Sequence, residues 1–427
     1  MHPPKFKWDW LRWTVLLGVS TVIGYALLRL RKSRAIDRMK LFDDIERNDD
    51  GPRPYAMPEF IYLNGSARSG VEEIRQTTEG WFSKYPRPHR AELRARFRSD
   101  NYAHRSAYFE LFLHELLLRL GCTVEIHPEI PGTGRHPDFL VTSKDGSSYY
   151  LEAILATDET RDEMASEARK NRVYDVLNKL ESSDFYIGMD LHGAPATPPP
   201  GKRIRAFLAK HLEQLDRAKI AALFERGGFP ALPHWRYEHD GWTVDFFPIP
   251  KSGNARMKPG VRPLGVIFEG VRILETRHSI RKAIQEKAGR YGRLPLPYVI
   301  GVNVLSDHVD DTDAIEALFG DEQLIYRSGV ALPQEPEYGR APNGAFYGPR
   351  GAQNTRVSSV LVFEQLNQSN IPWAAVCLYH NPWASRPYDG ELNRLRRGVV
   401  SPKAKMEYFD GETLAQVFGL RGDWPGE

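Results

Sequence analysis

Cysteine is scarce in this chain of 427 residues: there are two, Cys122 and Cys377, far apart and each in an apolar context. Two distant cysteines exclude a disulfide framework, and they leave no spacing that would bind zinc. We expect both to be buried small hydrophobic residues, which suits a reducing compartment.

A strong excess of charge of one sign is also absent. The formal net charge is +3 and the pI is near 8.6, which is too mild to indicate nucleic-acid binding from composition alone. There is no Walker loop, no GxGxxG or GxSxG motif and no internal repeat, so those signatures of function do not apply. Apolar residues are plentiful at 41%, enough for a substantial core and against global disorder.

The longest uncharged run of interest lies at the N-terminus, from Trp13 to Leu28. It is shorter than the roughly 20 residues of a spanning helix, but its flanking arginines can reach the interface, and tryptophans precede it. We expect residues 13–30 to span a membrane once, within an anchor of residues 1–34. The basic residues that follow place the main domain in the cytoplasm. A cleaved signal peptide and a soluble apolar helix are the alternatives.

Residues 35–69 are charged and then rich in proline and glycine, which is typical of a linker. Residues 70–100 look helical, with Arg90, Arg94 and Arg98 on one face. This face could meet phosphates. We favour the interpretation that it is solvated and paired with local acids such as Glu92.

The pattern of elements predicts an α/β fold. A nuclease-like core of residues 70–193 is expected to hold a helix at 104–120, strands at 123–127, 137–143 and 148–156, a helix at 158–181 and a strand at 185–190. Such an order favours a mixed sheet with helices on both faces. Residues 194–427 form an expected α/β extension packed on the core, with helices near 202–226 and 277–290. Its strands, near 242–249, 264–269, 298–305, 358–363 and 373–379, either extend the first sheet or form a second lobe.

Three carboxylates occupy successive elements of this core. Glu110 flanks the apolar stripe of the helix, Asp138 follows Pro137 at the start of a strand, and Glu152 lies in the apolar run of the next strand. A buried carboxylate needs a partner, and in-core ionisable groups gather at functional sites. Hard divalent cations prefer oxygen ligands, so Asp138, Glu152 and the carbonyl of Ala153 are the expected ligands of Mg²⁺.

Glu110, the Pro137-Asp138 pair and Glu152 in Leu-Glu-Ala-Ile resemble the PD-(D/E)XK nuclease superfamily over roughly residues 104–190. The resemblance implies a restriction-endonuclease-like sheet and magnesium-dependent cleavage of DNA. Later segments such as Pro297–Asn303 also look like bacterial proteins of this type, a likeness that implies no activity.

One residue departs from that pattern, because the family's lysine position is Ile154. The lysine orients or activates the attacking water and stabilises charge on the phosphate. In some relatives it has moved to a neighbouring helix, and Lys170 in helix 158–181 is the expected substitute here. Alternatively, Lys170 lies on a solvated face with Glu167 and Asp175 as partners.

Two principal functions follow from the sequence. The first is a nuclease in which Asp138 and Glu152 hold Mg²⁺ while Glu110 and Lys170 assist. The second is a catalytically inactive nuclease-like domain that binds nucleic acid or protein while tethered to the membrane; Ile154 favours it. A metal-dependent hydrolase of another phosphate ester is a weaker third.

Overall fold

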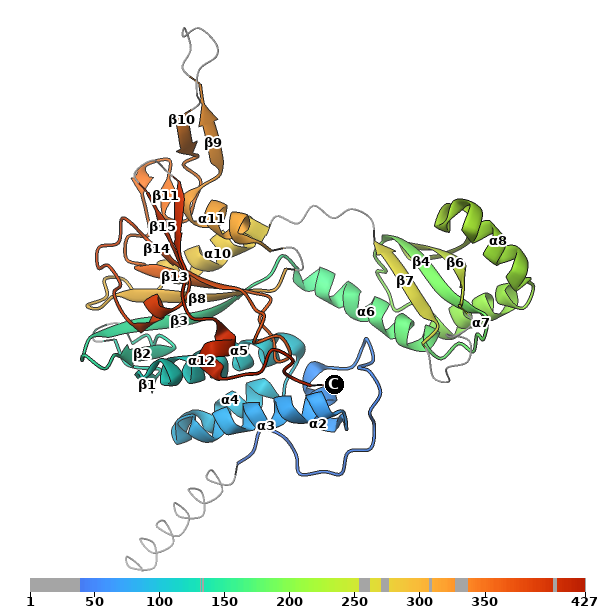
Figure 1. The fold of residues 1–427 in the computed structure, drawn as a ribbon, viewed down its shortest axis with the longest axis horizontal. Helices are drawn as coiled ribbons and strands as arrows, with labels where there is room; N and C mark the ends of the chain where they lie inside the picture. The colour runs from blue at the N-terminus through green and yellow to red at the C-terminus, as the bar shows by residue number, and fades with distance from the viewer. Residues whose placement is uncertain are drawn as a thin grey trace, which may run out of the picture.

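The computed structural model describes residues 39–130, 132, 134–252, 262–269, 276–306, 309–326, 337–401 and 405–426. They form a main body and a second lobe, joined along a long helix (Figure 1). The expected membrane anchor, residues 1–34, lies outside the described residues. Within the described ranges, no helix is long and apolar enough to cross a membrane.

The main body is built on an eight-stranded mixed sheet of order β1-β2-β3-β8-β13-β14-β15-β16. Antiparallel pairs join β1 to β2 and β2 to β3, whereas β3 pairs with β8 and β8 with β13 in parallel. The strands are β1 (Thr123–Ile126), β2 (Phe139–Thr142), β3 (Ser148–Ala156), β8 (Tyr298–Val304), β13 (Ser359–Glu364), β14 (Val376–His380), β15 (Arg397–Val400) and β16 (Met406–Phe409).

Helices cover both faces of this sheet. One face packs on a core shared by α2 (Glu59–Gly65), α3 (Ser69–Lys84), α4 (Arg90–Phe97), α5 (Asn101–Leu120) and α12 (Leu414–Phe418). The other face packs on α10 (Thr276–Ala288) and α11 (Asp311–Phe319). Helix α5 ends where expected, because Gly121 adopts a left-handed conformation at φ 92° and closes the last turn.

The second lobe is a four-stranded sheet of order β5-β6-β4-β7. Its strands are β4 (Phe185–Gly193), β5 (Trp235–His239), β6 (Trp242–Pro250) and β7 (Leu264–Glu269). Apolar residues of α6 (Arg161–Leu177) and α7 (Gly201–Leu212) cover one face, and those of α8 (Arg217–Gly227) cover the other. The whole lobe is therefore inserted between β3 and α10 of the main body.

Small elements complete the fold. The pair β9 (Glu322–Ile325) and β10 (Glu337–Arg340) projects from the main body (Figure 1). A shorter antiparallel pair joins β11 (Tyr347–Gly348) to β12 (Gly351–Ala352). In the described part of the chain, short 3₁₀ turns span Arg87–His89, Phe229–Ala231 and Glu391–Arg394.

The mixed sheet flanked by helices is as predicted, but its strands are distributed differently. Strand 185–190 was expected beside the first three; it lies instead in the second lobe, because β4 pairs with β6 and β7. The expected helix 202–226 is broken, since Asp216 caps a new helix, α8. The predicted core of residues 70–193 therefore does not correspond to one sheet, because β4 lies in the second lobe. The later strands β8, β13 and β14 belong to the eight-stranded sheet of the main body.

Residues 39–69 are not a linker in this structure. They include α2 and bury Leu41, Phe42 and Phe60 in the main core. The two carboxylate oxygens of Glu79 accept the backbone N–H groups of Leu41 and Phe42 at 3.0–3.2 Å. These contacts from α3 fix a segment whose own composition predicts no structure.

Candidate active site at the edge of the main sheet

Strand β3 extends beyond the end of its neighbour β2, so the last part of β3 has an open edge on that side. The antiparallel register of the two strands pairs Phe139, the first residue of β2, with Leu151, whereas β3 continues to Ala156. Among the described residues, no strand pairs with the backbone of β3 on this side beyond Leu151. The N–H of Ala153 donates instead to Asp138 Oδ2 at 2.7 Å. The Pro-Asp pair is thus held against the next strand by a backbone hydrogen bond.

Asp138 and Glu152 meet at this edge, as the sequence predicted. The N–H of Asp138 donates to Glu152 Oε2 at 3.3 Å, and the Glu152 side chain is only 1% exposed. Burial, together with the nearby charges of Glu152 and Glu110, raises the pKa of Asp138 to about 7. The Asp138 carboxyl is therefore only partly ionised at neutral pH, and a cation bound beside it would favour the ionised form.

A lysine does reach these acids, and it comes from α10. Lys287 Nζ lies 2.5 Å from Glu152 Oε1. Tyr291 donates its hydroxyl to Glu152 Oε2 at 2.7 Å, and Arg290 lies 3.5 Å from Oε1. Glu152 is therefore surrounded by donors from one short stretch of chain that the sequence did not connect with it.

Helical periodicity explains why Lys287 arrives there. The buried stripe of α10 consists of Ile280, Ala283, Ile284 and Ala288. Lys287 is four residues after Ala283 and seven after Ile280, so it lies on that stripe. The apolar contacts that pack α10 on the sheet thus carry the ammonium group to Glu152. A lysine at an apolar stripe position was the available sequence signal.

Lys170, the expected substitute, is placed elsewhere. Helix α6 leaves the end of β3 and packs on α7 in the second lobe, and it does not cross the open edge (Figure 1). Lys170 Nζ lies 2.6 Å from Glu167 Oε2 on the same helix. The ammonium group that bonds Glu152 belongs to Lys287. At the family's own lysine position, Ile154 packs against the core that includes α10.

Glu110 approaches the same region from α5. Its Oε1 accepts the hydroxyl of Tyr85 at 2.5 Å, and its Oε2 is 2.6 Å from Arg96. Burial and the Glu110 carboxylate raise the pKa of Tyr85, so the phenol stays a donor. Arg96 also bonds Glu92. The neighbouring face of Arg90, Arg94 and Arg98, expected to be solvated, is not: Arg90 is buried and bonds the carbonyl of Tyr85, and Arg98 pairs with Asp43. Glu110 acts on Asp138 through its charge, and its own oxygens are held by other partners.

The oxygen atoms at this edge are few, which suits a cation that keeps much of its bound water. In an extended strand the N–H and C=O of one residue point to the same side, so the carbonyl of Ala153 faces the open edge beside Asp138. This carbonyl and the two carboxylates are the oxygen donors that Mg²⁺ uses. Among the described residues, no group of three or more His, Cys, Asp or Glu side chains is arranged to hold a metal ion. Two carboxylates and a carbonyl are what this edge offers.

The chain has no counterpart in the comparisons with known proteins: no family model, no curated protein and no solved structure matches it.

Proposed function

We propose that this chain is a magnesium-dependent nuclease that hydrolyses phosphodiester bonds of DNA, tethered to the membrane by residues 13–30 with its main domain in the cytoplasm. The observation that best supports the activity is the contact of 2.5 Å between Lys287 and Glu152 beside Asp138. It brings a positive group and two carboxylates together at an open strand edge, where an extended strand of nucleic acid can approach.

Each residue has a role that its position supports. Asp138, Glu152 and the carbonyl of Ala153 would hold Mg²⁺, which lowers the pKa of bound water and neutralises charge on the phosphate. Lys287 is placed to orient the attacking water and to offset negative charge that develops on the phosphate. Tyr291 holds Glu152 in position through its hydroxyl. Glu110 adds negative charge near Asp138 and so favours a bound cation.

Cleavage by the full chain, purified in mild detergent, tests the proposal. Plasmid, linear duplex, single-stranded DNA and RNA are incubated with Mg²⁺ or with EDTA. We expect magnesium-dependent cleavage of DNA that falls about 10²–10³-fold in Asp138→Ala and in Lys287→Ala. If cleavage is absent on every substrate, or persists in both variants, the proposal is wrong.

Two matched controls sharpen this test. Lys282→Ala changes an exposed lysine on the same helix and should leave activity unchanged. Lys170→Ala separates the two candidate lysines, because its ammonium group bonds Glu167. Loss of cleavage in Lys170→Ala, with activity kept in Lys287→Ala, would reverse the assignment made from the structure.

A second function is favoured by one observation: both oxygens of Glu152 already have protein partners, Lys287, Tyr291 and the N–H of Asp138. A carboxylate so well satisfied suits a catalytically inactive domain that binds nucleic acid or protein. This alternative expects DNA binding that weakens with salt, needs no Mg²⁺ and proceeds without cleavage.

A further inference from the structure

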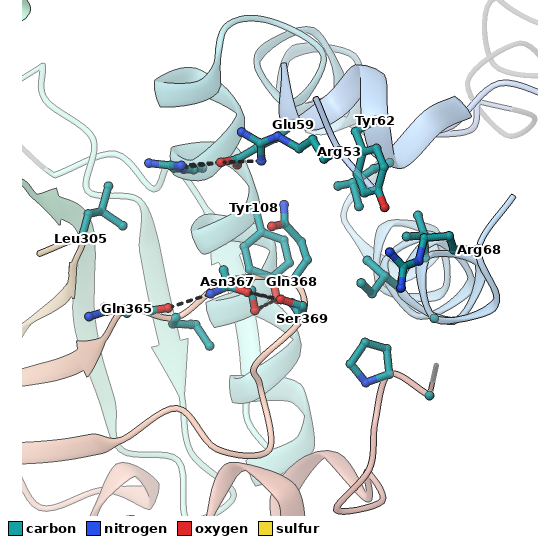
Figure 2. Close-up of a pocket in the computed structure, with 18 residues that line it drawn as sticks. Arg53, Glu59, Tyr62, Arg68, Tyr108, Leu305, Gln365, Asn367, Gln368 and Ser369 are labelled. Carbon is teal, nitrogen blue, oxygen red and sulfur yellow. Dashed lines mark hydrogen bonds and ion pairs between the residues drawn. The ribbon is translucent and has the colours of Figure 1, made fainter. Parts of the chain in front are cut away.

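A cavity of about 550 Å³ lies in the main body, apart from the residues that surround Glu152. Its walls come from α2 and the chain before it, the start of α3, α5, the loop of residues 365–369, and residues 425–426 (Figure 2). Ligand pockets in proteins typically measure about 300–1,000 Å³. The cavity therefore has the size of a site for a small organic molecule.

The charged groups of the wall leave a positive surplus. Three arginines, Arg53, Arg68 and Arg105, face one carboxylate, Glu59, so the lining carries a net charge of +2. Arg105 bonds Glu59 through Nε at 2.9 Å, and Arg53 lies 3.4 Å from the same oxygen. Although burial opposes it, the bond from Arg105 holds the pKa of Glu59 below its ordinary value, so the carboxylate is ionised.

Of the three arginines in the wall, Arg68 is the one that does not contact Glu59. It immediately precedes α3, its side chain is exposed, and its guanidinium bonds no other described residue. Figure 2 shows Arg68 on the wall opposite the 365–369 loop. A guanidinium offers two parallel N–H donors to a phosphate. Arg68 can therefore bind an anion without giving up an existing contact.

The opposite wall offers a buried acceptor. His104 Nδ1 lies 2.6 Å from the carbonyl of Phe97, which can only accept, so Nδ1 carries the proton. Burial lowers the pKa of His104, and the neutral ring accepts at Nε2 from the side-chain nitrogen of Gln368 at 2.6 Å. Gln368 is 8% exposed, and no described residue bonds its Oε1. That oxygen remains for an N–H or O–H group in the cavity.

We infer that this cavity is a binding site for a small phosphate monoester whose organic part is about the size of a nucleoside. A phosphate monoester carries about −1.5 to −2 charge at pH 7, which matches the net +2 of the wall; a single carboxylate would supply only half of that charge. The volume exceeds what a phosphate group alone would fill, and Tyr62, Tyr108 and Leu366 provide apolar surface for the remainder. Gln368 Oε1 would accept a hydrogen bond from the organic part.

Calorimetric titration of the full chain tests the inference. The probes are AMP, adenosine and inorganic phosphate, each in EDTA so that no metal contributes. We expect one AMP per chain, with adenosine and inorganic phosphate each bound at least about tenfold more weakly, because each lacks half of the recognised groups. Equal binding of inorganic phosphate would reduce the cavity to an adventitious anion site, and no binding of AMP at millimolar concentration would refute the inference.

Variants locate the bound probe. Arg68→Gln should weaken AMP binding by at least about tenfold, since it removes a charge-assisted pair of hydrogen bonds and breaks no contact within the described chain. Arg350→Gln, at another exposed arginine, should leave binding unchanged. Lys287→Ala should also leave it unchanged. If Lys287→Ala abolishes AMP binding while Arg68→Gln does not, the nucleotide occupies the candidate active site and the inference fails, whatever the outcome of the cleavage assay.

Discussion

Replacing Asp138 by asparagine should make the protein more stable, and more so as the pH rises. The folded protein holds this carboxyl beside Glu152, and burial with that neighbouring charge raises its pKa from the ordinary 3.8 to about 7. Asparagine has nearly the same shape but no charge, and its side-chain oxygen can still accept the N–H of Ala153, now bonded at 2.7 Å. The substitution therefore removes the charge and keeps the contact.

The sign of the effect follows from proton linkage. Because the folded pKa lies above the unfolded value, the folded wild type binds more protons between pH 4 and 7, and it loses stability as the pH rises through that interval. A pKa difference from 3.8 to about 7, at about 1.4 kcal/mol per tenfold change, gives a ceiling of about 4 kcal/mol above pH 7. Asp138 keeps some solvent contact, and water screens part of the charge interaction, so we expect about 2 kcal/mol of this ceiling.

Urea denaturation of wild type and Asp138→Asn at pH 5, 6, 7 and 8 measures this difference. The stability advantage of the variant should already be present at pH 5 and should grow until pH 8, because the wild type loses stability from about pH 4 to pH 7. Asp145→Asn is the control, because this exposed carboxyl in the β2–β3 turn has a lowered pKa and should give no such gain. A variant that is less stable than wild type at pH 8, or a difference independent of pH, would refute the reasoning. Mg²⁺ should stabilise the wild type at pH 8 and not Asp138→Asn.

Two further outcomes are expected. Adding Ile154→Lys to Lys287→Ala should raise the rate of cleavage at least about tenfold above that of Lys287→Ala alone, since it returns an ammonium group to the same sheet face. No recovery would contradict the role given to Lys287. Phe112→Ala should lower the free energy of unfolding by about 3–5 kcal/mol, because this buried ring packs on four other aromatic rings. Urea denaturation measures the change, and a loss below about 1 kcal/mol would contradict the packing.

The parts of the fold that were predictable are those specified by local signals. Strand 148–156 matches β3 at both ends, because an apolar run follows a Lys-Asp-Gly-Ser turn whose Gly146 has φ 87°. The helix before it ends at Gly121 for the same kind of reason. Asp138 and Glu152 were also brought together correctly, since a hairpin places them side by side.

The parts that were not predictable depend on distant contacts. Lys287 lies 135 residues from the carboxylate it bonds, and nothing near Glu152 in the sequence refers to it. Strand 185–190 has the composition of a strand in either sheet, and its partners β6 and β7 decide where it lies. The segment before α2 has few apolar residues, and Glu79 and the pairing of Arg98 with Asp43 hold it in place.

The insertion of the second lobe between β3 and α10 has a consequence for how the protein is made. The carboxylate of Glu152 leaves the ribosome 135 residues before the ammonium group of Lys287. At a synthesis rate of about 5–20 residues per second, this delay is about 7–27 seconds, during which the second lobe can fold. Strand β8, the partner of β3, appears later still. The nascent chain therefore cannot assemble the proposed catalytic set before most of its sequence exists, and an active nuclease would be present only once the central sheet has closed.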